Sequence, residues 1–172
     1  TEAWLMQEFT KRAKACQLEV DCLGSGKLES EICIIGEAPG EREALMKMPL
    51  VGGSGKLLWD VLKPLDISRK DCYVTNVVKR QVSLSSKTDA RNPVKRVEIE
   101  HWEGLLDWEL DHLPNLKYIL VLGNMALHAL IGVTGITNWR GSVYDINVGR
   151  KQRKIKAIIT NNPAHVLRNI QM

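Results

Sequence analysis

The chain has 172 residues, of which 44% are hydrophobic and 26% charged, and its formal net charge at pH 7 is +4. These values are typical of a globular domain, so disorder is not the default expectation. No apolar run approaches the roughly 20 residues that span a bilayer, so we expect no membrane-spanning helix and no membrane as a partner. We expect one domain over residues 1–172, which is either a whole protein or one domain of a larger one.

The four cysteines show no metal-binding pattern. Cys33 and Cys72 lie in apolar, strand-like runs, where a free thiol behaves as a small hydrophobic side chain. Cys16 and Cys22 have neither a CxxC spacing nor a neighbouring histidine, which argues against a zinc site. A reducing compartment, the cytoplasm, is the simpler location for such a chain.

The first predicted elements are a helix and a buried strand. Apolar residues at helical spacing predict a helix over 3–16, and a short apolar run predicts a strand over 32–35. The strand leads directly into the turn Gly36–Gly40, with the sequence Gly-Glu-Ala-Pro-Gly. Proline fixes its own φ, and glycine allows the backbone to approach a flat ligand. The turn therefore presents main-chain N–H groups and one carboxylate, Glu37, in a fixed array.

A loop over 41–51 and a glycine-rich segment precede a helix predicted over 56–65. The segment from Val51 to Lys56 superficially matches a phosphate-binding P-loop. It fails on spacing, because the first required glycine would be Leu50, and on chemistry, because Leu57 stands where Ser or Thr would bind magnesium. Binding of a nucleoside triphosphate is excluded on this ground.

The rest of the chain continues the alternation. Strands are predicted at 72–78, 118–122 and 155–160, helices at 93–112, 123–131 and from 161 onward, a polar loop at 83–92 and a hairpin-like stretch around 139–141. Four apolar strands alternating with helices predict a three-layer α/β/α sandwich around a mostly parallel four-stranded sheet. Sites in such folds lie outside the carboxyl ends of the strands, which gathers Glu37, Asn76 and Asn162 on one rim.

Basic residues gather near the ends of predicted elements. The clusters are Lys79–Arg80, Lys95–Arg96 and the run from Arg150 to Lys156. Each cluster alone is equally compatible with solvated surface. Together they favour a partner that carries phosphate groups.

Five short motifs carry a resemblance to a known family. They are Gly36–Gly40, Pro49–Gly52, Thr75–Lys79, Leu122–Gly123 and Asn162–Arg168, in that order. From about Cys16 to its end the chain resembles the uracil-DNA glycosylase superfamily, and within it the iron–sulfur (family four) branch. The resemblance implies an enzyme that hydrolyses the N-glycosidic bond of uracil or another altered pyrimidine in DNA. It also implies DNA with a flipped-out base as the partner, and we expect a monomer.

Two positions depart from the pattern of that branch. The branch has Pro-Phe-Val-Gly with the Phe stacking on uracil, and here Leu50 replaces the Phe. Leucine offers no aromatic face, so the pocket would be wider and would suit a bulkier pyrimidine, although ordinary core packing explains Leu50 equally well. The last motif usually begins with His, and here it begins with Asn162. A neutral amide can donate to O2 of the leaving base but cannot become cationic, so weaker stabilisation is expected.

The iron–sulfur ligands of the branch are mostly replaced. By the resemblance, Cys16 keeps one of four cysteine positions, and Ala13, Arg80 and His101 occupy the other three. We therefore expect no iron–sulfur cluster, no other cofactor and no metal.

The resemblance implies roles for the rim residues. Glu37 and Asn162 would be the catalytic pair, with Glu37 positioning or polarising the attacking water. Asn76 fits O4 and N3–H of uracil, but after a 180° rotation the same amide fits cytosine. Alternatively, Glu37 caps a nearby N–H group and Asn76 caps a turn. The expected base-binding residues are Gly36, Ala38, Pro39, Gly40, Leu50 and Asn76.

The resemblance also implies contacts with the rest of the DNA. The residues concerned are Gly53, Ser54, Lys79, Arg80, His165, Val166 and Arg168. Arg168 and the N–H groups around 53–54 would hold phosphates, and residues 165–166 would wedge into the duplex. Lys79 and Arg80 would touch the DNA backbone, with solvated surface as an equal alternative. A surface ion pair is the alternative for Arg168.

A different class of function stays open. A catalytically weak DNA-binding module of the same fold, for example a polymerase-associated domain, is favoured by Leu50, Asn162 and the expected loss of the cluster. Retention of both Glu37 and Asn76 favours the enzyme, since a binding module has no physical need of both. A protein-interaction domain would require the basic residues of the rim to be incidental.

Overall fold

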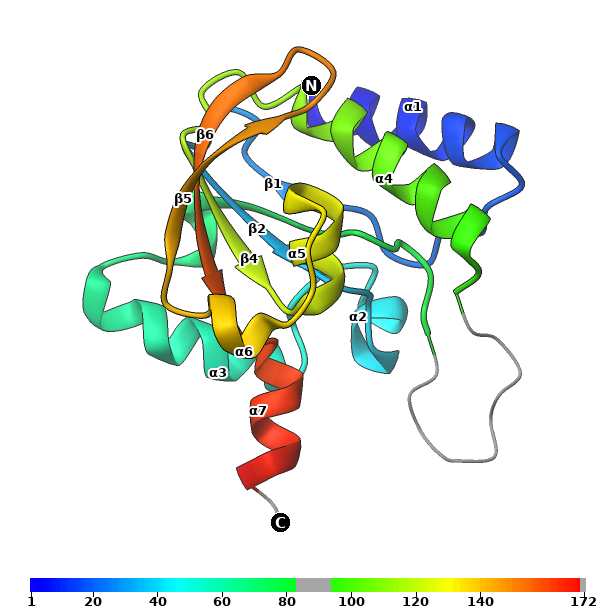
Figure 1. The fold of residues 1–172 in the computed structure, drawn as a ribbon. Helices are drawn as coiled ribbons and strands as arrows, with labels where there is room; N and C mark the ends of the chain where they lie inside the picture. The colour runs from blue at the N-terminus through cyan, green and yellow to red at the C-terminus, as the bar shows by residue number, and fades with distance from the viewer. Residues whose placement is uncertain (83–93, 171–172) are drawn as a thin grey trace.

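The structure, a computed structural model, describes residues 1–82 and 94–170 (Figure 1). The helices are α1 (Glu2–Ala15), α2 (Glu41–Met46), α3 (Gly53–Leu62), α4 (Arg96–Leu110), α5 (Asn124–Ile131), α6 (Ile136–Trp139) and α7 (Pro163–Ile170), with short 3-10 turns at Lys63–Leu65 and Arg69–Asp71. The strands are β1 (Ser25–Gly26), β2 (Ile32–Gly36), β3 (Cys72–Asn76), β4 (Tyr118–Leu122), β5 (Val143–Val148) and β6 (Arg153–Thr160). The loop predicted at 83–92 lies outside the described residues.

One six-stranded sheet, in the order β1-β3-β2-β4-β6-β5, runs through the molecule. The inner strands β3, β2, β4 and β6 are parallel, and they correspond to the four strands predicted from apolar runs. The two edge strands, β1 and β5, are antiparallel to their neighbours. They were not predicted, so the sheet has six strands where four were expected. β1 has only two residues and β5 is largely exposed, so neither produces a continuous apolar run.

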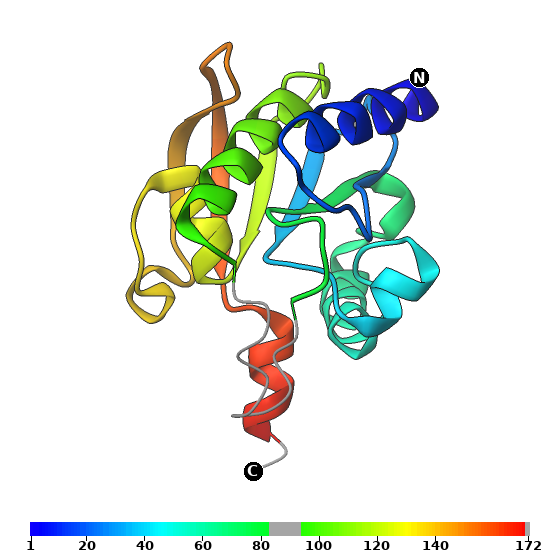
Figure 2. The ribbon, with the colours of Figure 1, turned by 90° about the vertical axis from the view of Figure 1, so that its right-hand side faces the viewer.

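Both faces of the sheet are covered by helices, which confirms the predicted α/β fold. α1, α4 and α5 pack on one face against residues such as Cys33 and Ile35 (Figures 1 and 2). α3 packs on the other face, where Leu58 shares one buried cluster with Ile34 and Val74. Because the inner strands are buried on both sides, they are apolar without alternation.

Two further segments differ from their predicted structure. The loop predicted at 41–51 contains the helix α2, which is too short to show helical periodicity. The hairpin-like stretch predicted around 139–141 begins with the short helix α6, and the hairpin itself is formed by β5 and β6 farther along the chain.

The carboxyl ends of the parallel strands form one rim of the sheet, and α7 projects from the body beside it (Figures 1 and 2). The turn between β5 and β6 carries Arg150 and Lys151 at the amino end of β6, away from this rim. Arg153 donates to the carbonyl oxygens of Leu110 and Leu113, at and just beyond the carboxyl end of α4. This basic run is therefore distant from the predicted site. Within 1–82 and 94–170, no helix is long and apolar enough to span a membrane.

Candidate active site

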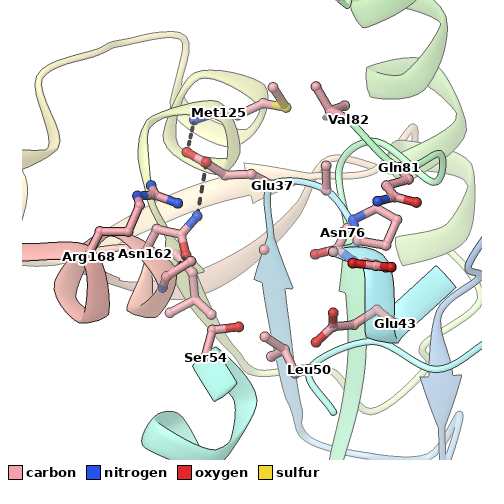
Figure 3. A pocket seen from close by; sticks show the side chains of 17 residues that line it. Glu37, Glu43, Leu50, Ser54, Asn76, Gln81, Val82, Met125, Asn162 and Arg168 are labelled. Atoms are coloured by element: carbon pink, nitrogen blue, oxygen red, sulfur yellow. Dashed lines mark hydrogen bonds between the residues drawn. The ribbon is translucent and has the colours of Figure 1, made fainter. Parts of the chain in front are cut away.

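A cleft of about 340 Å³ opens at the rim (Figure 3). Its volume suits a small ligand such as one nucleobase. It brings together most of the predicted site residues: Gly36, Glu37, Ala38, Pro39, Gly40, Leu50, Ser54, Asn76, Asn162 and Arg168. These residues come from the ends of β2, β3 and β6, the loops after β2 and α2, the start of α3, and α7, where Arg168 lies in the last turn.

The carboxylate of Glu37 is fixed at the amino end of α5. Its Oε1 accepts a hydrogen bond from the backbone N–H of Met125 at 3.1 Å. Gly123, which precedes α5, has φ of +89°, and a Cβ atom there would collide with the carboxylate. A helix amino terminus favours a negative charge. Glu37 thus makes the capping contact that was its alternative role, and it also faces the cleft.

Asn162 joins the end of β6 to Glu37 and to α7. Its Nδ2 donates to Oε2 of Glu37 at 3.0 Å (Figure 3). Its Oδ1 accepts from the backbone N–H of Ala164 at 2.9 Å. A primary amide carries two N–H donors, so one remains for a ligand in the cleft. The contacts with Glu37 and α7 fix the orientation of this donor.

Asn76 ends β3 on the other side of the cleft from Glu37 and Asn162 (Figure 3). The residue is only 4% exposed, and a Cβ atom at Gly36 would collide with its Oδ1. Among residues 1–82 and 94–170, none makes a hydrogen bond to its side-chain amide. Its polar groups are therefore available to a ligand, and the turn-capping role is not seen among these residues.

Leu50 lines the cleft and also packs in the core on the α3 side, next to Ile34 and Leu58. Leu50 therefore makes the core contacts of one interpretation, and its contact with a base stays a prediction. Its φ of +54° is in the left-handed region, which leucine rarely adopts. Its carbonyl oxygen accepts from Nε1 of Trp59 at 3.1 Å and from Nη1 of Arg69 at 3.4 Å. Such a conformation persists at a site only where neighbours hold it.

Residues 23–172 of the chain match the family model described as the uracil DNA glycosylase superfamily. The chain belongs to this superfamily. A type-4 uracil-DNA glycosylase of Archaeoglobus fulgidus is 34% identical over 155 residues, which cover 87% of this chain and 73% of that protein. One of Thermotoga maritima is 31% identical over 171 residues, covering 96% and 83%. A DNA polymerase of Bacillus phage SP01 is 29% identical over 129 residues, 74% of this chain and 13% of the polymerase.

These matches confirm the resemblance to the uracil-DNA glycosylase superfamily that the motifs indicated. They also agree with the α/β fold seen here. The activity of this member and the role of each residue in it remain proposals.

A second carboxylate in the cleft, Glu43, was missed from the sequence. It is 7% exposed, and its Oε1 accepts from the backbone N–H groups of Gly52 at 2.7 Å and Val51 at 3.2 Å. It therefore ties α2 to the turn that holds Leu50. Because residues 41–51 were predicted to be a loop, nothing in the sequence indicated that the side chain of Glu43 is buried. The other cleft residues that were not predicted are Glu41, Gln81, Val82, Leu122, Met125 and Ala164.

The positions of Lys79 and Arg80 do not fit the expected DNA contacts or a solvated surface. Lys79 is 0% exposed, and its Nζ donates to Oε2 of Glu109 and to Oγ1 of Thr75, both at 2.7 Å. Arg80 is 6% exposed and binds the Glu98 carboxylate through Nε at 2.5 Å and Nη2 at 2.9 Å. Both carboxylates come from α4, a pairing that the local sequence does not reveal.

Gly53, His165 and Val166 are not among the residues that line the cleft. Gly53 starts α3, where a Cβ atom would only contact Leu167. His165 and Val166 lie on the projecting helix α7, and His165 Nε2 is 2.9 Å from Nδ2 of Asn169. Their proposed contact with a duplex stays a prediction.

Three of the four positions related to cluster ligands carry residues that do not fit an iron–sulfur cluster. Ala13 is buried in the core, the Arg80 guanidinium is paired with Glu98, and His101 is exposed on α4. In the described ranges, no group of three or more His, Cys, Asp and Glu side chains is placed to hold a metal ion. The absence of a cluster stays a prediction, which the iron content of the purified protein tests.

Proposed function

We propose that this chain is a DNA glycosylase that hydrolyses the bond between uracil and deoxyribose in DNA and leaves an abasic site. The observation that carries the proposal is that Glu37, Asn162 and Asn76, from three different strand ends, line one cleft. Membership of the superfamily and similarity to type-4 uracil-DNA glycosylases support it. The proposed partner is DNA whose target base has left the stack.

In this proposal the flipped base enters between two polar walls. Asn76 binds O4 and N3–H of uracil with its free amide. Leu50 covers one face of the ring by apolar contact. Glu37 and Asn162 form the opposite wall of the cleft (Figure 3). In this proposal the glycosidic bond and the sugar lie beside that wall.

Glu37 and Asn162 have different tasks in the proposed reaction. Each oxygen of Glu37 accepts one hydrogen bond from the protein and keeps capacity to orient a water molecule. The water oxygen bonds to C1′ while the C1′–N1 bond breaks, and a water proton passes to Glu37. The second N–H of Asn162 donates to O2 of the leaving base, where negative charge develops.

A bulkier pyrimidine is a further substrate that the site would admit. Leu50 lacks the flat ring that stacks on uracil in the resembled branch, so the space above the base would be less tightly defined. Substituted pyrimidines should therefore be tested beside uracil.

The decisive experiment measures the release of abasic sites from oligonucleotides that carry uracil, hydroxymethylated or glucosylated pyrimidines, each single-stranded and in duplex. Release from one substrate that is lost in Glu37→Gln, with DNA affinity retained, is the expected result. Glu41→Gln is a matched control, because Glu41 also lines the cleft but is exposed at the start of α2. Equal activity of Glu37→Gln and the wild type would contradict the role of Glu37.

A catalytically weak DNA-holding domain is the second candidate. The similarity to a segment that makes up 13% of a phage DNA polymerase favours it, as does Asn162 in place of His. In that case no substrate would release a base, and tight, salt-sensitive DNA binding would remain unchanged in Glu37→Gln.

A further inference from the structure

A buried charged network lies directly behind Asn76. The ammonium group of Lys79 donates to the carbonyl oxygen of Asn76, to Oγ1 of Thr75 and to Oε2 of Glu109. The side chains of Lys79 and Glu109 are 0% and 2% exposed. The pair therefore cannot touch DNA, although Lys79 belongs to a motif that resembles one of the superfamily.

The network is closed on every side by protein. Glu109 also accepts from the Tyr73 hydroxyl at 2.8 Å and from Oγ1 of Thr75 at 3.0 Å. A Cβ atom at Gly24 would collide with the Glu109 and Tyr73 oxygens. The ring of Phe9 lies 5.1 Å from the Lys79 Nζ. Residues of α1, β3, α4 and the segment before β1 thus enclose one ion pair.

Stability alone does not explain this arrangement. Replacing a buried ion pair with apolar side chains of similar volume is often neutral or stabilising. An apolar pair could not make the hydrogen bonds to Tyr73, Thr75 and the Asn76 carbonyl oxygen, and of these three residues only Asn76 lines the cleft. We therefore look for the role of the Lys79–Glu109 ion pair at Asn76, the residue that ends β3.

The chain leaves the sheet at that point under tight backbone control. The N–H of Val77 donates to the Gly36 carbonyl oxygen at 3.0 Å, and the N–H of Val78 donates to that of Glu37 at 2.9 Å. The Lys79 ammonium holds the carbonyl oxygen that precedes them. Because no described residue bonds to the side-chain amide of Asn76, the backbone decides where this amide points.

We infer that Lys79 and Glu109 are positioning residues that place the amide of Asn76 for base recognition, an inference that rests on the proposed function. The ion pair fixes the end of β3 relative to α4. It lies behind the cleft and not in it. A displacement of about 1 Å at a recognition group can lower a rate on the order of a hundredfold. Loss of the network should therefore weaken excision without removing any group that touches the base.

The test replaces both charges at once with Lys79→Met/Glu109→Gln. Glutamine keeps an acceptor for Tyr73, and the double change avoids leaving one buried charge unpaired. We expect kcat/KM for uracil excision to fall about tenfold or more. In an Asn76→Ala background, where no amide remains to be placed, the same double change should cause no further loss. An equal loss in both backgrounds, or no loss in either, would overturn the inference.

Arg80→Met/Glu98→Gln is the matched control. This neighbouring ion pair also joins the segment after β3 to α4, and the two hydrogen bonds between Arg80 and Glu98 do not involve Asn76. It should lower the melting temperature, and any effect on kcat/KM should be the same with and without the Asn76 amide. If Lys79→Met/Glu109→Gln does not fold, Thr75→Val removes one partner of the network, keeps both charges and should show the same pattern in weaker form.

Failure of the proposed function is recognised separately. If the wild type releases no base, or if Asn76→Ala excises uracil as well as the wild type, the proposed chemistry is wrong.

Crystal structures of the two double variants then test the positioning of Asn76 directly. Asn76 should shift relative to Gly36 in Lys79→Met/Glu109→Gln and stay in place in the control. An unshifted Asn76 would refute the inference whatever the activity.

Discussion

The cleft depends on side chains that touch backbone rather than ligand. Glu43 is the clearest case, since it holds the N–H groups of Val51 and Gly52 and thereby the turn in which Leu50 has positive φ. Trp59 and Arg69 hold the carbonyl oxygen of Leu50 from the other side. The side of the cleft that Leu50 forms is thus shaped by residues that a ligand need not contact.

Glu43→Ala should lower uracil excision about tenfold, because two N–H groups lose a charged acceptor and the turn at Leu50 loosens. Glu43→Gln keeps one acceptor oxygen and should recover most of the rate. Single-turnover excision measures both, with Glu41→Ala as the control on the same helix. Wild-type activity in Glu43→Ala would show that the turn holds its shape without this carboxylate.

At the level of elements, the ion pair of Arg80 and Glu98 ties the segment after β3 to α4. The hydrogen bonds from Arg80 lower the pKa of Glu98 below its usual value of 4.5, against the opposing effect of burial. A carboxyl group whose pKa is lowered on folding stabilises the fold above its unfolded pKa. That stabilisation is lost as the pH falls through the lowered value, while Arg80 stays charged.

Glu98→Gln should therefore reduce the melting temperature by several degrees at pH 7. The difference from the wild type should shrink as the pH falls below about 4.5 and vanish once Glu98 is protonated in the folded state. Thermal melts of both proteins between pH 3 and pH 7 follow this difference. A gap that stays constant over that range would mean that the charge of Glu98 contributes nothing.

The four parallel strands and the Gly36–Gly40 turn could be predicted, because apolar runs and turn residues are local signals. Two-residue β1, exposed β5 and six-residue α2 lack such signals. The roles expected for Lys79 and Arg80 failed for a different reason. Their partners Glu109 and Glu98 lie 30 and 18 residues away, and only tertiary packing brings them together.

At the level of the whole molecule, positive charge is distributed over two ends. Arg168 lies at the cleft, whereas Arg150 and Lys151 lie in the β5–β6 turn at the other end of the parallel strands. The net charge of +4 is therefore a poor guide to the strength of DNA binding.

Arg168→Ala should weaken binding of a uracil-containing oligonucleotide and reduce the slope of log affinity against log salt by about one. Arg150→Ala/Lys151→Ala should leave the slope unchanged, even though it removes more charge. Fluorescence anisotropy at several salt concentrations compares the two variants. A larger effect from the β5–β6 turn would place the DNA on the opposite end of the molecule.

In the proposed reaction, the amide of Asn162, which Glu37 holds in place, has a consequence for the kind of base that can leave. An amide donates a hydrogen bond but transfers no proton, so the departing pyrimidine must carry its own electron pair as an anion. Departure is then governed by the acidity of the free base at N1. Electron-withdrawing substituents such as fluorine at C5 should accelerate excision, and bases of low acidity should be released slowly even when they fit. The enzyme would rank its substrates by leaving-group quality as much as by shape.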